Sequence, residues 1–290
     1  MATTASVRRG LGARVRHEVV LWRDLFAKHD LLTLASAIAF QAFFALVALV
    51  LLGLGLLAAI GREDVWEQDI APQVADRVLP GVFLGINQTA ERIFATGTFG
   101  LIAFALLLTL WKVSGAVRAC MTALSRIYDA EEKRPWTLRF AISIGLAAVV
   151  TAAIIGAVLL TLVAKGAGGG VWGFPLALAR WLGAILLIGF AFGLIVRRAP
   201  AEPRSTRWAS AGATLVVIGW IVESLVFQWY VTSIANFKSA VGSLAVFLVL
   251  TGYLYTASLI LLMGMQLDEL LRKNLKGKER HIGHHLRDLF

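Results

Sequence analysis

The sequence is poor in cysteine and in charged residues, and both shortages narrow what the chain can be. Its single cysteine, Cys120, excludes an internal disulfide and any four-cysteine metal site. Charged residues make up 16% of the 290 residues, against about 25% in a typical soluble domain. Hydrophobic residues make up 58%, and the mean hydropathy is +0.76. This composition indicates an integral membrane protein.

The sequence also lacks the motifs of the common hydrolases. It has no phosphate-binding glycine loop followed by Lys-Ser or Lys-Thr, so we expect no ATP hydrolysis. Its best carboxylate cluster, Asp129, Glu131 and Glu132, lies among basic residues and is typical of a salt-bridged loop rather than a nuclease metal site. The HIGHH motif at 281–285 could bind a metal, but no carboxylate–histidine constellation surrounds it, so we expect a solvated basic tail. We therefore predict no enzyme activity, no cofactor and no bound metal.

Long apolar runs predict an all-α membrane domain. A run of about twenty residues spans the roughly 30 Å hydrocarbon core as a helix. Six such transmembrane helices are predicted, at residues 31–60, 98–118, 139–164, 175–196, 209–231 and 243–267. Residues 61–97 carry several carboxylates and two prolines, and are expected to form short helices outside the membrane.

Lysine and arginine in the loops predict the orientation. They concentrate before the first span, between the second and third, between the fourth and fifth, and after the sixth. The positive-inside rule therefore places both termini in the cytoplasm. This leaves residues 1–30 as a basic cytoplasmic segment with an amphipathic helix, 31–267 as the membrane domain and 268–290 as a basic tail. The net charge of +10 is explained by topology and by anionic lipid headgroups as partners, without nucleic acid.

Two charged residues inside the predicted spans, Lys112 and Glu223, are the leading candidates for a substrate or ion pathway, because burying a charge costs at least about 2.5–3.5 kcal/mol. Lys112 lies about 9 Å inside the predicted cytoplasmic boundary at Arg118, and its side chain leans toward the bilayer centre. Three arrangements remain open: a direct ion pair, a shared wet cavity, or snorkelling of Lys112 to the headgroups with Glu223 unrelated.

Four uncharged polar residues are weaker pathway candidates. Gln41, Gln228 and Gln266 lie on three different predicted spans, where an interhelical hydrogen bond is the alternative role. Asn236 lies in the predicted outer loop SIANFKSAVG, which could form either a simple turn or a gate over a cavity.

The stretch LWKVSGAVRACMTALSRIYDAEEKRPW, residues 110–136, resembles the YihY/BrkB family of bacterial inner-membrane proteins. The resemblance covers roughly residues 20–270, and its motif residues here are Trp111, Ser114, Gly115, Arg126, Tyr128 and Pro135. It implies a six-helix, multi-pass protein of the bacterial cytoplasmic membrane, suspected of transport or envelope maintenance. Members of the family were formerly labelled ribonuclease BN.

Together these features predict a transporter or flippase that is not driven by ATP. A lysine in a membrane cavity would favour an anionic solute or lipid headgroup. The alternatives are a non-transporting scaffold for envelope assembly or stress, and, more remotely, a ribonuclease. A homo-oligomer is compatible with any of the three.

Overall fold

The computed structural model describes residues 28–76, 80–96, 99–163, 173–200, 211–233 and 240–287, and these ranges contain helices but no strand. Six helices in them are long and apolar enough to cross a membrane, which confirms the predicted all-α architecture. They are α2 (Leu31–Ala59), α5 (Phe99–Ile127), α6 (Trp136–Val163), α7 (Gly173–Arg198), α8 (Ala211–Ser233) and α9 (Ala240–Arg287). The predicted N-terminal amphipathic helix lies outside the described residues, apart from Lys28.

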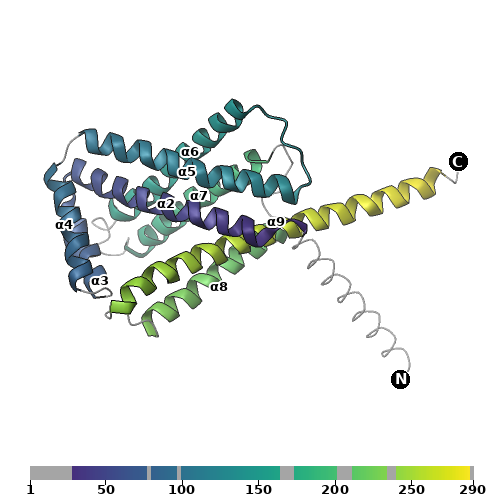
Figure 1. Cartoon of the computed structure of the whole chain (residues 1–290). Coiled ribbons are helices and arrows are strands. Elements are labelled where there is room, and N and C mark those ends of the chain that lie inside the picture. The colour runs from purple at the N-terminus through teal and green to yellow at the C-terminus, as the bar shows by residue number, and fades with distance from the viewer. Residues whose placement is uncertain are drawn as a thin grey trace, which may run out of the picture.

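Two helices run well past the ends that hydropathy predicts. α5 continues from 118 to Ile127, and α9 continues beyond 267 to Arg287, projecting from the bundle in Figure 1. Hydropathy detects the apolar part of a helix, whereas hydrogen bonding carries the helix on through polar residues. In α5 the added turns are held by the buried side chains of Met121 and Leu124. Arg118, predicted at the membrane boundary, is therefore an interior residue of its helix.

Three helices lie in the described parts of the segment between the first two spans, residues 61–76 and 80–96. They are η1 (Val65–Ile70), α3 (Ala71–Ala75) and α4 (Pro80–Thr96). Trp66 is buried and donates a hydrogen bond from its indole Nε1 to Oδ1 of Asn87 at 3.0 Å, which ties η1 to α4. In Figure 1, α4 crosses the end of the bundle at which α2 ends and α5 begins.

The core of the bundle forms where α2 packs against α5 and α9. Thr109 of α5 is fully buried and donates to the carbonyl oxygen of Ala48 in α2 at 3.0 Å. α8 and α9 approach so closely that a Cβ on Gly212 would lie 2.1 Å from the carbonyl oxygen of Gly264. Such contact between small residues is the usual way for membrane helices to pack tightly. The apolar side chains exposed along α7 and α8 are suited to face lipid.

Candidate functional site

A polar cavity of about 450 Å³ lies between α2, α5 and α6, at the end of the bundle where α2 and α6 begin and α5 ends. Two of its lining side chains, Phe40 and Trp136, are 62% and 73% exposed, so the cavity reaches the outer surface of the bundle. Its volume falls within the roughly 300–1,000 Å³ of typical ligand sites. The lining residues are Ala37, Phe40, Gln41, Gly115, Arg118, Ala119, Thr122, Trp136, Arg139 and Phe140.

Arg118 reaches this cavity from α5 and is held by neutral groups. Its Nη1 donates to Oγ of Ser114 at 2.9 Å and to Oγ of Ser143 at 3.2 Å, and both serines are fully buried. Its guanidinium carbon lies 5.2 Å from the ring centroid of Phe140, a favourable cation–π distance. These contacts fix the position of the guanidinium group without neutralising its charge.

Arg139 reaches the same cavity from the first turn of α6. Its Nη2 donates to Oγ1 of Thr122, whereas its Nε is buried and has no hydrogen-bond partner. Buried donors are almost always satisfied, and an orphaned one points to a missing ligand or water. Arg139 therefore carries both a charge and an unused donor at the cavity.

No carboxylate oxygen of the described residues lies within 4 Å of Arg118 or Arg139. Glu132 is close enough for Arg139 to affect it, but its two oxygens accept hydrogen bonds from Arg134 at 2.7 and 2.8 Å. The hydrogen bond from Arg134 is the main reason that the pKa of Glu132 lies below its ordinary value, and Arg139 adds a smaller effect. Among the described residues, the two arginines thus share one cavity without a carboxylate in ion-pair contact with either.

Gln41 and Gly115 form the part of the cavity nearest the membrane centre. A Cβ on Gly115 would lie 2.7 Å from Oε1 of Gln41, so glycine makes room for the amide of Gln41. Gln41, a predicted pathway residue, does line a cavity with charged groups. Gly115, a residue of the family motif, leaves the space that the amide of Gln41 occupies.

Lys112 lies about one helical turn beyond Gly115, on the membrane-centre side of the cavity. Its Nζ lies 5.2 Å from the ring centroid of Phe44 in α2 and 5.8 Å from that of Trp111. Phe44 is about 20 Å along α2 from Leu31, so the ammonium group lies at mid-helix depth. This geometry places the ammonium group against the rings of Phe44 and Trp111.

The structure does not join Lys112 to Glu223, so the hypothesis of a direct ion pair is wrong. Glu223 lies on α8, where one carboxylate oxygen accepts a hydrogen bond from Thr256 of α9 and the other is buried without a partner. Lys112 lies on α5 and faces α2. The sequence could not separate them, because equal depth along two helices does not show which helices are neighbours.

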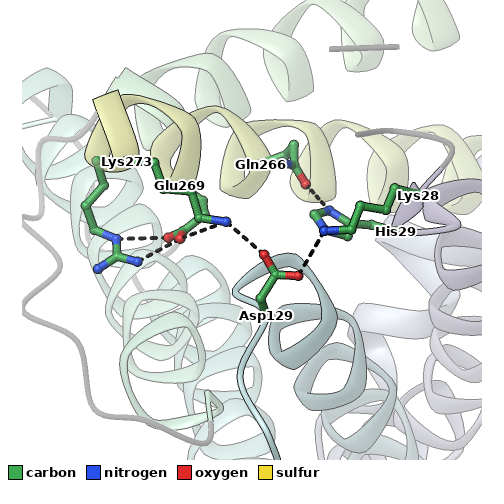
Figure 2. A network of polar contacts seen from close by, with 7 residues as sticks. Lys28, His29, Asp129, Gln266, Glu269 and Lys273 are labelled. Atoms are coloured by element: carbon green, nitrogen blue, oxygen red, sulfur yellow. Dashed lines mark hydrogen bonds and ion pairs between the residues drawn. The ribbon is translucent and has the colours of Figure 1, made fainter. Parts of the chain in front are cut away.

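A network of polar contacts around Asp129 lies at the same end of the bundle (Figure 2), and we refer to it as the polar junction. Asp129 lies in the turn after α5 and has a left-handed conformation with φ 48°. Its carboxylate contacts Lys28 at 3.4 Å, Lys273 at 2.8 Å and Nε2 of His29 at 3.6 Å. The hydrogen bond from Lys273 is the main reason that the pKa of Asp129 lies below its ordinary value. His29 is buried, and its Nδ1 lies 2.7 Å from Oε1 of Gln266. The junction thus ties α2, α5 and α9 together.

A second polar cavity, of about 540 Å³, connects this junction with the first. Thr122 and Arg139 line both cavities, and the second is also lined by Arg126 and by the carboxylates of Asp129, Glu131 and Glu132. From the end of the bundle inward, the cations Arg126, Arg139, Arg118 and Lys112 follow one another. We refer to these four residues as the basic ladder.

The remaining predicted residues have other positions. Gln266 belongs to the junction, and Gln228 is exposed on α8 and lines none of the cavities described here. Asn236 lies outside the described residues. Of the motif residues, Tyr128 is buried with its hydroxyl 3.7 Å from the sulfur of Met265, and the carbonyl oxygen of Pro135 accepts from the backbone N–H of Arg139.

Sequence reasoning missed Arg118 and Arg139, because it counted both as loop charges that set the orientation. The available signal was Ser114, four residues before Arg118 and hence on the same helical face. An arginine at the membrane surface can donate its hydrogen bonds to water. An arginine inside a helix bundle needs an acceptor from the protein, such as the hydroxyl of Ser114.

Comparisons with known proteins agree with this architecture. The model of the family described as Virulence factor BrkB matches residues 23–287. The ribonuclease-like protein YfkH of Bacillus subtilis is 24% identical over 267 residues, covering 88% of this chain and 96% of YfkH. No solved structure matches the chain significantly.

Other relatives are longer than this chain. A UPF0761 membrane protein of Nitrosospira multiformis is 24% identical over 254 residues, covering 82% of this chain and 57% of the relative. A UPF0761 membrane protein of Xanthomonas campestris is 24% identical over 259 residues, covering 85% and 58% respectively. The matched region thus spans little more than half the length of these two relatives.

Proposed function

Because the chain belongs to the Virulence factor BrkB family, whose architecture here is that of a multi-pass membrane protein, we propose that it is a transporter or flippase not driven by ATP. Its cargo is an anionic solute or lipid headgroup. The cavity between α2, α5 and α6 binds the anion, and the basic ladder guides it toward the membrane centre.

The observation that carries this proposal is the pair of arginines without a counter-ion. A charged group away from water is costly unless it is paired. Arg118 and Arg139 line one cavity, and no carboxylate of the described residues lies within 4 Å of either. Guanidinium groups bind phosphate and carboxylate through paired, charge-assisted hydrogen bonds. An anion entering the cavity would supply the missing charge and use the free Nε of Arg139.

Lys112 extends the site toward the membrane centre. It lies about 9 Å along α5 from Arg118, with its Nζ beside Phe44 of α2. An anion leaving the arginines would meet this ammonium group next along the α2–α5 surface. In this proposal Arg118 and Arg139 bind the anion. Lys112 then lowers the free energy of the anion as it moves along α2 and α5 toward the membrane centre.

The alternative functions have less support. A scaffold would need no open, charged cavity at this end of the bundle. The word ribonuclease in the name of YfkH describes that protein, and in the described part of this chain no group of three or more His, Cys, Asp or Glu side chains is placed to hold a metal ion. Polar cavities lined by arginine favour transport of an anion.

The proposal is tested by reconstituting the protein in liposomes. The movement of fluorescent phosphatidylglycerol and phosphatidylcholine between leaflets is followed by quenching with dithionite. Uptake of radiolabelled phosphate and glycerol phosphate is measured in parallel, to distinguish a lipid from a free anion. Faster movement of at least one anionic probe than of phosphatidylcholine is expected, and Arg118→Gln and Arg139→Gln should slow it.

Arg198→Gln is the matched control, because Arg198 is exposed at the end of α7 and lines none of the described cavities. It removes one positive charge and should leave all rates unchanged. Equal rates for all probes in liposomes with and without protein would refute the proposed transport. Equal slowing by Arg198→Gln would refute the assignment of the site.

A further inference from the structure

A third cavity, which is apolar, lies between α2 and α9, next to the polar cavity lined by Arg118 and Arg139. Its volume is about 450 Å³, and its lining is almost wholly apolar. The rings of Phe43 and Phe247 meet across it, with centroids 5.0 Å apart. The lining residues are Ser36, Ala39, Phe40, Phe43, Phe44, Phe247, Thr251, Gly252 and Tyr255.

Phe40 connects the two cavities, because it lines both of them. Its side chain is 62% exposed on the outer surface of α2. The cavity lined by the arginines and the apolar cavity therefore meet at this ring. A single molecule with a charged end and a hydrocarbon chain could occupy both by crossing Phe40.

We propose that the cargo is a phospholipid, with its anionic phosphate headgroup at Arg118 and Arg139 and one acyl chain in the cavity between α2 and α9. This inference rests on the proposed function and narrows it from anions in general to anionic lipids. A free anion would use the charged cavity and leave the apolar one without a role. A zwitterionic phospholipid offers the same phosphate, but its own ammonium group offsets the negative charge, so we expect it to bind the two guanidinium groups more weakly.

Gly252 allows the acyl site to be tested separately from the headgroup site. It lines the apolar cavity, and a Cβ there would meet no atom within 4 Å. Gly252→Leu therefore fills the cavity without an initial clash, and leucine is a better helix former than glycine. Gly189→Leu is the matched control, because Gly189 is exposed on α7 and is equally open.

The first measurement is binding of short-chain phosphatidylglycerol and of glycerol phosphate to the purified full-length chain. Gly252→Leu should weaken phosphatidylglycerol about tenfold, since it displaces buried methylene groups, and should leave glycerol phosphate unchanged. Arg118→Gln should weaken both ligands, and Gly189→Leu neither. Thermal unfolding of each variant checks that it is folded.

The second measurement locates the chain directly, using phosphatidylglycerol with a photoreactive diazirine near the end of one acyl chain. Cross-links should concentrate on Phe43 and on residues 247–255, and Gly252→Leu should abolish them. If Gly252→Leu behaves like Gly189→Leu and cross-links scatter over α7 and α8, the acyl site is refuted while the anion site stands. If Arg118→Gln changes neither ligand, the proposed function fails as well.

Discussion

The Arg118→Gln substitution separates a binding arginine from a structural one. Arg118 is held by two neutral serine hydroxyls and faces Arg139 across the cavity without a carboxylate of its own. Removing its charge should therefore relieve repulsion in the empty protein. The variant also loses the hydrogen bonds to Ser114 and Ser143, which offset this relief, so we expect the thermal midpoint of the ligand-free variant to stay close to that of the wild type. A structural arginine paired within the fold would instead show a marked loss of stability.

The effect on the ligand follows from the hydrogen bonds that are lost. A hydrogen bond to a charged group contributes about 1.5–3 kcal/mol, and each 1.4 kcal/mol is tenfold in affinity. Arg118→Gln should thus weaken short-chain phosphatidylglycerol by about 10- to 150-fold. The rise in thermal midpoint on adding this lipid should shrink accordingly, because ligand stabilisation depends on the ratio of concentration to Kd.

The assay is thermal unfolding in detergent, with increasing phosphatidylglycerol or phosphatidylcholine. Glu223→Gln is the matched control, since it alters a membrane charge on α8 that contacts Thr256 and not the cavity. It should leave the lipid response unchanged. A less stable ligand-free Arg118→Gln with an unchanged lipid response would refute the reasoning, because Arg118 would then be part of the fold alone.

Three further predictions follow from the same geometry. Lys112→Leu should slow movement of anionic lipid across liposomes while leaving its affinity unchanged in binding assays, because Lys112 lies beyond the cavity. Gly115→Ala should weaken lipid affinity in the same binding assays, because the new Cβ would displace the amide of Gln41 into the cavity. Asp129→Asn should lower the free energy of unfolding at pH 7 by about 0.2–1 kcal/mol, as expected for an ion pair that is 46% exposed. The lowered pKa of Asp129 means that this difference is present above the ordinary value of about 3.9 and disappears as pH falls through the folded value, which chemical unfolding at several pH values would detect.

The fold was predictable in outline because hydropathy responds to burial in lipid, which is a local property of each segment. Hydropathy predicted the six spans. It placed the end of the second span at residue 118, whereas α5 continues to Ile127. That difference turned Arg118 from a supposed boundary residue into a cavity residue. Helix ends depend on hydrogen bonding and tertiary contacts, such as those of Met121 and Leu124, which hydropathy does not record.

The site was predictable only in part, because it depends on which helices are neighbours. Gln41 was identified by its polarity alone, and it does line the cavity. Glu223 was identified on the same grounds, yet α8 packs on α9, so its partner is Thr256 rather than Lys112. Gln266 proved to be an interhelical hydrogen-bonding residue, joined to His29 at the end of α2.

The most direct test of the account is an experimental structure of the protein in nanodiscs that contain phosphatidylglycerol. The account predicts density for a phosphate headgroup within hydrogen-bonding distance of both Arg118 and Arg139, with a chain passing over Phe40 toward Gly252. Ordered lipid elsewhere on the bundle, with the two arginines instead paired to carboxylates of the protein, would contradict it.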